Sequence, residues 1–126
     1  QEKEIYSKAE DEALHYIGIF ILKEANMSQL VFNLINFNLD SYSNLTFDVK
    51  GEELNKKYNM VMIKSFKSKG EAQKYLSDIS LKDDLFKDVK ATIHTYFMIS
   101  EANYQILQKD GSEGRYLRFY KQNYTK

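Results

Sequence analysis

The hydrophobic pattern is clearest between residues 58 and 79, where it predicts a β-strand followed by an α-helix. The stretch from Tyr58 to Phe66, YNMVMIKSF, has apolar residues at both parities and no breaker, which is typical of a strand inside a sheet. Ser68 and Glu71 then form a capping box, so a helix is predicted to begin at Ser68. Its apolar face recurs at helical spacing and consists of Ala72, Tyr75, Leu76 and Ile79.

Two strands and one helix are predicted before this unit. The segment 14–22, LHYIGIFIL, is apolar on both faces and is therefore a second central strand. Asn26 and Gln29 resemble a capping pair, and the helix that they open is expected to end near Tyr42. Residues 45–50 alternate between apolar and polar side chains, which indicates a half-exposed edge strand. The apolar stripe of the helix is formed by Met27, Leu30, Val31, Leu34 and Ile35.

The remaining segments are two loops, one strand and the C-terminal helices. Residues 51–57 are a polar connection, and residues 81–91 are a charged, partly helical loop anchored by Leu85, Phe86 and Val89. A fourth strand is predicted at residues 92–99, and Ser100 is expected to cap the helix that follows it. A last helix is predicted at residues 115–124, separated from its predecessor by Gly111 and Gly114.

The order of these elements is β-α-β-β-α-β followed by helices, which predicts an α+β fold. With right-handed crossovers, the order closes most simply as a ferredoxin-like, SPOR-like sheet with additional C-terminal helices. The first and third strands would be central, and both main helices would lie on one face. Residues 1–13 are predicted to be a charged linker or short helix, and residues 14–126 a single interaction domain.

The opposite face of this sheet is the candidate binding face. The face toward the two main helices is assigned the aliphatic parity: Ile17, Ile19, Ile21, Leu45, Phe47, Val49, Val61, Ile63, Ile93, Phe97 and Ile99. The other parity combines tyrosine and methionine, which suit a surface that is both apolar and wet. The candidate binding face then consists of Tyr16, Phe20, Tyr58, Met60, Met62, His94, Tyr96 and Met98.

Three occupants of this face agree with the pattern. The C-terminal helices would bury it if Tyr116 and Tyr120 packed on the sheet. Alternatively, two copies of the chain would form a homodimer through their sheets. A ligand or protein partner is the third possibility, since a large exposed apolar patch usually marks an interaction site.

Composition and charge exclude several classes of function. The 126 residues contain no cysteine, and Lys plus Arg equals Asp plus Glu at 18 each. Disulfides and thiolate metal sites are therefore excluded, and the neutral charge argues against nucleic acid as a partner. No apolar run approaches the roughly 18 residues of a membrane-spanning helix. The chain begins at Gln1 without a signal segment, and we read it as part of a longer protein.

No catalytic, metal or cofactor motif is recognised. The only histidines, His15 and His94, have no second ligand at a metal-like spacing, and lone histidines are usually structural. The acid pairs are surface charge in polar loops: Glu52 with Glu53, and Asp83 with Asp84. A basic, aromatic tail is the only feature that suggests RNA binding, but the strand at 58–66 does not match RNA-binding domains of this order. That tail contains Arg115, Tyr116, Arg118, Phe119, Tyr120, Lys121, Tyr124 and Lys126.

Several stretches together resemble the C-terminal domain of tetratricopeptide-repeat lipoproteins of Bacteroidetes, the PorW and SprE family linked to type IX secretion and gliding motility. The matching pieces are HYIGIFI at 15–21, NFNLDSYSNLTFDV at 36–49, VMIKSFKSKGEAQKYLSDI at 61–79, YFMISEANYQIL at 96–107 and GRYLRFYKQNY at 114–124. A more distant likeness is to SPOR domains, which bind peptidoglycan glycan strands. Residues 58–76 are similar to their third strand and second helix.

These resemblances imply a non-enzymatic function. The first implies a periplasmic domain, associated with the outer membrane through the missing N-terminal part of a lipoprotein. This domain would mediate protein-protein docking to other secretion-machinery proteins. The second implies, as the alternative, binding of peptidoglycan with tyrosines stacked on sugar rings. In either case we expect no enzyme activity, no cofactor and no nucleic acid, and a homodimer is possible.

Overall fold

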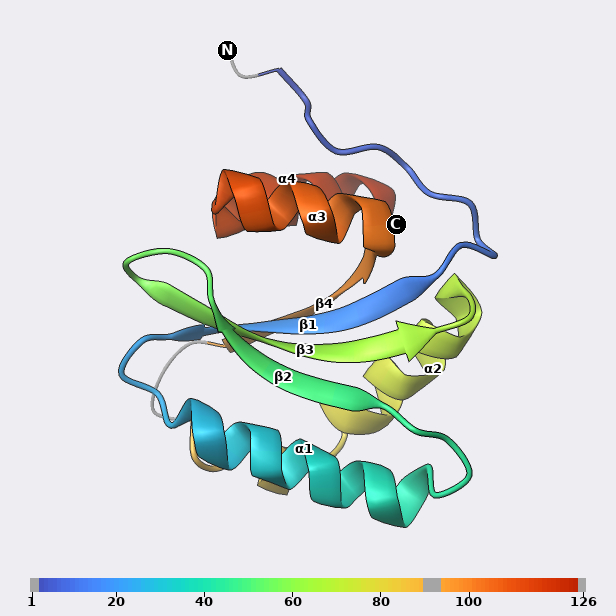
Figure 1. Cartoon of the computed structure of the whole chain (residues 1–126), viewed down its shortest axis with the longest axis vertical. Helices are drawn as coiled ribbons and strands as arrows, with labels where there is room; N and C mark the ends of the chain where they lie inside the picture. Colours follow the sequence, from blue (N-terminus) through green and yellow to red (C-terminus); the bar gives the residue numbers. More distant parts are fainter. Residues whose placement is uncertain (1–2, 90–93, 125–126) are drawn as a thin grey trace.

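The computed structural model describes residues 3–89 and 94–124, which form a four-stranded antiparallel sheet with helices on both faces (Figure 1). The strands are β1 (His15–Leu22), β2 (Asp48–Glu53), β3 (Tyr58–Phe66) and β4 (His94–Ser100). The α-helices are α1 (Met27–Ser41), α2 (Lys69–Ser80), α3 (Glu101–Asp110) and α4 (Glu113–Asn123), and a 3₁₀ helix, η1, covers Asp83–Phe86. The fold class is therefore α+β, as the sequence predicts.

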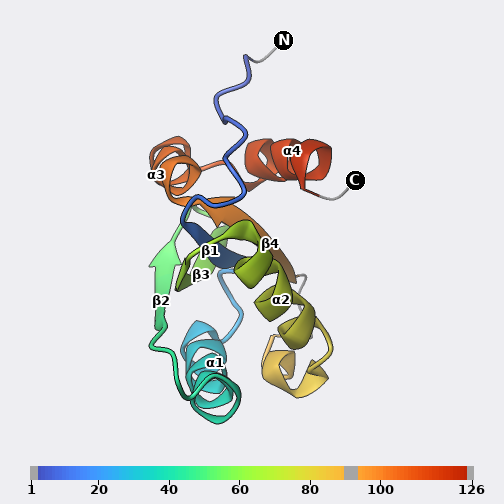
Figure 2. The ribbon, with the colours of Figure 1, turned by 90° about the vertical axis from the view of Figure 1, so that its right-hand side faces the viewer.

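The strands lie in the order β2-β3-β1-β4, so β1 and β3 are central and β2 and β4 are the edges. Every neighbouring pair is antiparallel. The helices form two separate layers: α1 and α2 cover one face, while α3 and α4 cover the other (Figures 1 and 2). The molecule is therefore a three-layer structure with the sheet in the middle.

The predicted helix starts are confirmed by side-chain caps. The Oγ atom of Ser68 accepts a hydrogen bond from the amide of Glu71 at 3.2 Å, and Oδ1 of Asn26 accepts one from Gln29 at the same distance. Ser100 caps α3 in the same way. These caps satisfy amides that have no partner inside the helix, which is why such residues mark helix starts.

The edge strand β2 lies later in the chain than predicted. Residues 45–47 precede the strand, and Gly51–Glu53, predicted to be part of a polar connection, belong to it. Gly51 pairs with Val61, and a Cβ atom there would lie 2.8 Å from Sδ of Met27 in α1. A glycine inside the strand thus lets α1 pack closely against β2, which the alternation rule does not detect.

The described part of the predicted linker, residues 3–13, contains no helix. Tyr6 is only 4% exposed, and its ring centroid lies 5.0 Å from that of Tyr116. The amide of Ser7 donates to Asn103 Oδ1, and Asn103 Nδ2 donates back to the carbonyl of Ser7. This extended segment is therefore anchored on α3 and α4 by one aromatic ring and one paired amide.

Candidate functional site

The β1 and β3 members of the candidate binding face lie on the side of α3 and α4. Gly18 faces both Phe97 and Met62 across the sheet, and its missing side chain admits the Phe97 ring, since a Cβ would lie 2.3 Å from Cζ. Phe20 stacks on the same ring with a centroid separation of 4.4 Å. Four of these residues are buried and only one is half-exposed: Tyr16, Phe20, Met60 and Met62 are buried, and Tyr58 is half-exposed.

The β4 members lie on the other face, so this part of the prediction is wrong. Met98 pairs with Ile17, and Tyr96 pairs with Ile19, which places their side chains with the aliphatic residues above α1 and α2. His94 shares that parity and stacks on Phe86 of η1 with ring centroids 4.7 Å apart. The opposite parity of β4, Phe97 and Ile99, therefore faces α3 and α4. Ile93, assigned to the helix face, and Thr92 lie outside the described residues.

The aromatic face of the sheet is closed by α4. The ring centroid of Tyr116 lies 5.3 Å from that of Phe97, and the Tyr116 hydroxyl donates to the carbonyl of Met98 at 2.5 Å. Tyr120 also contacts the Phe97 ring. Of the three predicted occupants of this face, the C-terminal helices are the one that lies on it.

A polar cluster seals the same face at the β2 side. The Nζ atom of Lys64 lies 5.4 Å from the ring centroid of Tyr16 and 4.6 Å from that of Tyr104, within cation-π range. The Tyr104 hydroxyl donates to Glu52, and the Tyr16 hydroxyl donates to Glu101 at 3.2 Å. Burial, together with the neighbouring carboxylates, raises the pKa of both phenols. They are therefore hydrogen-bond donors and not bases.

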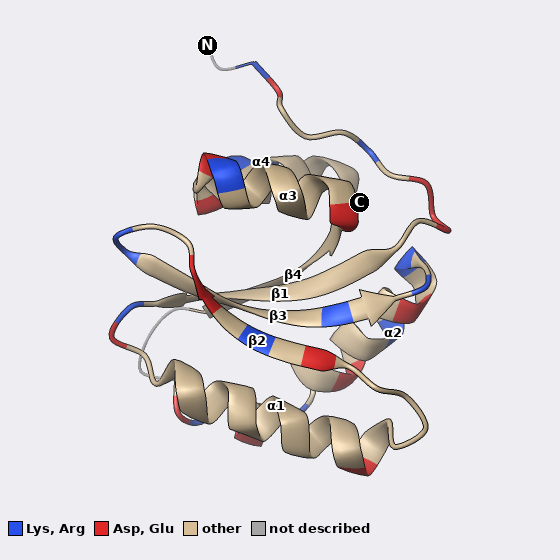
Figure 3. Cartoon of the chain, viewed as in Figure 1, with Lys and Arg blue, Asp and Glu red and all other residues tan. Residues whose placement is uncertain are grey.

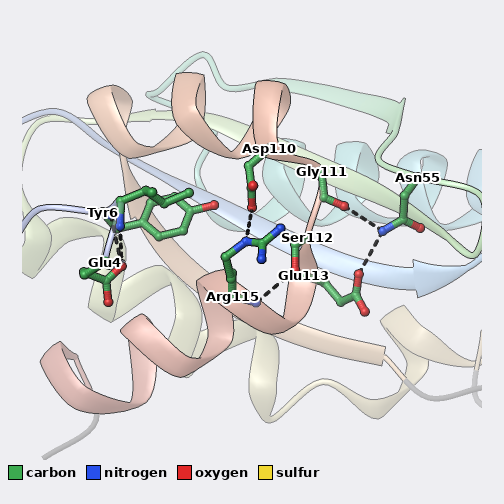
Figure 4. A network of polar contacts seen from close by, with 9 residues as sticks. Glu4, Tyr6, Asn55, Asp110, Gly111, Ser112, Glu113 and Arg115 are labelled. Carbon is green, nitrogen blue, oxygen red and sulfur yellow. Dashed lines mark hydrogen bonds and ion pairs between the residues drawn. The ribbon is translucent and has the colours of Figure 1, made fainter. Parts of the chain in front are cut away.

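A second network fixes the connection between α3 and α4 onto the β2–β3 turn (Figure 4). Asn55 Nδ2 donates at 2.8 Å both to the carbonyl of Gly111 and to Oε1 of Glu113. Gly111 has a left-handed backbone with φ of 73°, which favours glycine. Arg115 is held against Asp110, with Nε 2.9 Å from Oδ2. These bonds hold α3 and α4 on the sheet.

His15 is held by contacts at both of its ring nitrogens. His15 is buried, with Nδ1 2.8 Å from the Ala13 carbonyl and Nε2 2.9 Å from the Tyr124 hydroxyl. Within residues 3–89 and 94–124, no group of three His, Cys, Asp or Glu side chains is placed to hold a metal ion. Over the same residues, no helix is both long and apolar enough to cross a bilayer.

A groove remains open where α4 passes the edge of β4. Its volume is about 660 Å³, and it lies between Thr95 of β4 and the side chains of Leu117, Arg118, Tyr120 and Lys121 of α4. Thr95 pairs with Phe20, so the groove continues the aromatic face at the β4 edge of the sheet. The sequence indicated this surface only through the basic, aromatic character of residues 115–124.

A second accessible apolar surface lies on α1. Phe32 and Leu39 are exposed by 56% and 65%, and Ile35 by 41%. The prediction placed Ile35 on the inner face of this helix, but Leu30, Leu34 and Asn38 are the residues buried there. We call Phe32, Ile35 and Leu39 the α1 stripe.

Comparison with known proteins identifies no relative. No protein-family model, no curated protein and no solved structure matches this chain. The family resemblance of the sequence therefore stays a prediction.

Proposed function

We propose that this chain is a non-enzymatic docking domain of a larger periplasmic lipoprotein that acts in type IX secretion and gliding motility. The observation that supports docking is the groove between β4 and α4, whose lining combines the apolar Leu117 and Tyr120 with the basic Arg118 and Lys121. The resemblance to the PorW and SprE family supports the cellular role. The partner is another protein of the same machinery.

We also propose that the fold is ferredoxin-like, with a more distant likeness to SPOR domains. Support comes from the two crossovers, since α1 joins β1 to β2 and α2 joins β3 to β4, and from the central position of β1 and β3. Both crossover helices lie on one face (Figure 2), as a split β-α-β arrangement requires. The helices α3 and α4 are the addition to that plan.

The segment that docks is an extended one that pairs with the edge of β4 opposite β1. The Met98 carbonyl accepts from Tyr116 of α4 and so points away from β1. Along a strand, every second residue directs its amide and carbonyl to the same side. The amide and carbonyl of Tyr96 therefore also point away from β1. A strand laid there gains main-chain hydrogen bonds and places alternate side chains in the groove. Arg118 and Lys121 favour acidic residues in that strand.

The glycan alternative has less support. Sugar stacking needs tyrosines exposed together on one sheet face, whereas Tyr16 is 8% exposed under α3 and Tyr96 lies on the opposite face. Sedimentation of the chain with amidase-treated sacculi tests this alternative directly. Tyr58→Ala is the informative variant, since Tyr58 is the half-exposed member of the set.

The docking proposal is tested in the full lipoprotein with groove variants. Leu117→Asp and Arg118→Glu are expected to lower the recovery of secretion-machinery proteins with the tagged lipoprotein at least tenfold, and to reduce cargo secretion. Gln105→Glu is the control, because Gln105 is exposed on α3 and lies outside the groove. Thermal unfolding of the purified variants separates lost docking from lost folding. Normal recovery and secretion with folded groove variants would overturn the proposal.

A further inference from the structure

Residues 3–9, which we call the strap, lie on the side of α3 and α4 that faces away from the sheet (Figures 1 and 2). Tyr6 is the one buried residue among them. No hydrogen bond between main-chain groups joins the strap to the described part of the domain. The first such bond follows at Asp11, whose carbonyl accepts from the Lys69 amide at 2.7 Å. The strap is therefore held by a few side-chain contacts, as a bound peptide is.

Two rings of α4 hold the Tyr6 side chain. Its ring centroid lies 5.0 Å from that of Tyr116 in an edge-to-face arrangement, and 5.6 Å from that of Phe119. The Tyr6 hydroxyl is buried as well, points toward Asp110 and Arg115 (Figure 4), and makes no hydrogen bond to any described residue. A buried hydroxyl without a partner costs free energy. The site therefore accommodates an aromatic ring but does not match the hydroxyl of tyrosine.

Asn103 of α3 holds the residue that follows the ring. Its Oδ1 accepts from the amide of Ser7 at 3.2 Å, and its Nδ2 donates to the Ser7 carbonyl at 2.8 Å. Both bonds go to main-chain atoms, so this contact accepts any residue except proline, which lacks the amide hydrogen. Asn103 is only 1% exposed, and a buried amide group needs hydrogen-bond partners. The surface is therefore built to take an extended main chain beside an aromatic side chain.

We propose that the outer surface of α3 and α4 is a binding site for an extended peptide with an aromatic residue, and that the strap fills this site as a tethered, displaceable ligand. The partner is an extended segment of another protein that has phenylalanine at the place of Tyr6, followed by any residue except proline. Such a segment displaces the strap, because the strap makes few contacts and buries an unpaired hydroxyl. This inference goes beyond docking at the β4 edge and does not depend on it.

The tether sets how strongly the strap competes with a partner. A ligand joined by a few residues has an effective concentration on the order of 1 mM, so a strap whose free peptide has a dissociation constant on the order of 100 µM weakens a competitor about tenfold. Release leaves the rest of the fold in place, since Asp11 stays bonded to α2. The released strap is also well solvated, because charged residues flank its aromatic ring at Lys3, Glu4 and Lys8 (Figure 3).

Peptide binding to the whole chain tests the site. The probe is a fluorescent peptide with the strap sequence, KEIYSKA, and the readout is its anisotropy. Tyr6→Ala vacates the ring site, so this variant should bind the peptide with a dissociation constant on the order of 100 µM, and the wild type about tenfold more weakly. Adding Asn103→Ala to Tyr6→Ala should weaken binding about tenfold, because two hydrogen bonds are lost. Adding Gln105→Ala instead is the control, since Gln105 is exposed on the same helix.

Displacement is tested in the wild-type chain, so this measurement does not depend on the folding of a variant. A peptide with Tyr6→Phe should bind the Tyr6→Ala chain severalfold more tightly than the strap peptide, since it buries no hydroxyl. In excess, it should move the NMR signal of the Ser7 amide in the wild-type chain toward the random-coil position. Absence of binding to a folded Tyr6→Ala chain at about 1 mM peptide would overturn the proposal. So would equal binding by wild type and Tyr6→Ala, or a Ser7 signal that does not move.

Discussion

The two faces of the sheet are both buried, but they are built from different side chains. Toward α1 and α2, the central strands β1 and β3 present aliphatic residues, and toward α3 and α4 they present rings and thioethers, which Phe97 of β4 joins. The first set includes Ile17, Ile19, Ile21, Val61 and Ile63, and the second includes Tyr16, Phe20, Met60, Met62 and Phe97. The combination of aromatic residues and methionine is the one expected of an exposed binding surface. In this chain it is instead buried between the sheet and the helices α3 and α4.

A buried aromatic face differs from an exposed one in having hydrogen-bond partners within the protein for its tyrosine hydroxyls. Tyr116 spans the layer and donates to a carbonyl of β4, while Tyr16 and Tyr104 donate to carboxylates at the rim. A buried tyrosine is stable once its hydroxyl has a partner. Tyrosine and methionine on a sheet therefore indicate an occupant of mixed polarity, which in this chain is its own C-terminal helices.

The largest expected effect comes from removing the centre of the aromatic layer. Phe97→Ala should lower the free energy of unfolding by about 3–5 kcal/mol, because Phe97 is fully buried and contacts Phe20, Tyr116 and Tyr120. Urea unfolding of both Phe97→Ala and Ile19→Ala measures the two faces side by side. Similar losses are expected, and a loss below about 1 kcal/mol for Phe97→Ala alone would mean that α3 and α4 do not seal this face in solution.

A smaller effect is expected from filling the space that Phe97 uses. Gly18→Ala should cost about 1–3 kcal/mol, since its Cβ would lie 2.3 Å from one carbon of the ring and 2.7 Å from another. Combining Gly18→Ala with Phe97→Leu frees that space, so the double variant should lose less than the two single losses summed. A double-mutant cycle measures this coupling, and strict additivity would contradict the close contact.

The sequence predicted the elements whose signals are local. The strands β1 and β3 have apolar residues at both parities, and Asn26, Ser68 and Ser100 cap the helices as predicted. These signals are reliable because a cap satisfies amides of its own first turn, whatever the rest of the chain does.

The sequence did not predict the orientation of β4 or the accessible surfaces. The strand HTYFMIS has aromatic or apolar residues at both parities, so only its register against Gly18 decides which side faces α4. In α1 the apolar residues extend around most of the helix, and the buried Asn38, which accepts from Tyr75, was not recognised as an inner residue. The groove needs β4 and α4 placed together, which no local pattern specifies.

Removing single hydroxyls compares the polar closure of the two faces. Tyr116→Phe deletes the bond to the Met98 carbonyl, and Tyr75→Phe deletes the bond from α2 to Asn38 Oδ1 of α1, each 2.5 Å long. Each change should cost about 0.5–1.5 kcal/mol, because the ring remains and one buried acceptor loses its donor. Thermal unfolding suffices as the measurement. A stabilised Tyr116→Phe variant would show that this hydroxyl contributes nothing to holding α4 on the sheet.

The two layers also differ in how many tyrosines make the free energy of unfolding depend on alkaline pH. This dependence is absent at pH 7. Burial is the main cause that raises the pKa of six tyrosines in the α3 and α4 layer, to about 12 for Tyr124; the others are Tyr6, Tyr16, Tyr104, Tyr116 and Tyr120. In the α1 and α2 layer, burial likewise raises the pKa of Tyr42 and of Tyr75.

The sign of this effect follows from proton binding. Unfolded tyrosines titrate near pH 10, so below that value both states are protonated and these groups add no pH dependence. Above it the unfolded chain releases its protons first, and the free energy of unfolding falls as pH rises toward the folded pKa values. Urea unfolding between about pH 9 and 11 should show this fall. Replacing Tyr116 and Tyr124 by Phe together should flatten it more than Tyr42→Phe does, because two such phenols are removed instead of one. The contrary result is the same fall of the unfolding free energy with pH in the wild type, the double variant and Tyr42→Phe. It would mean that the tyrosines of the aromatic layer are as solvated as in the unfolded chain.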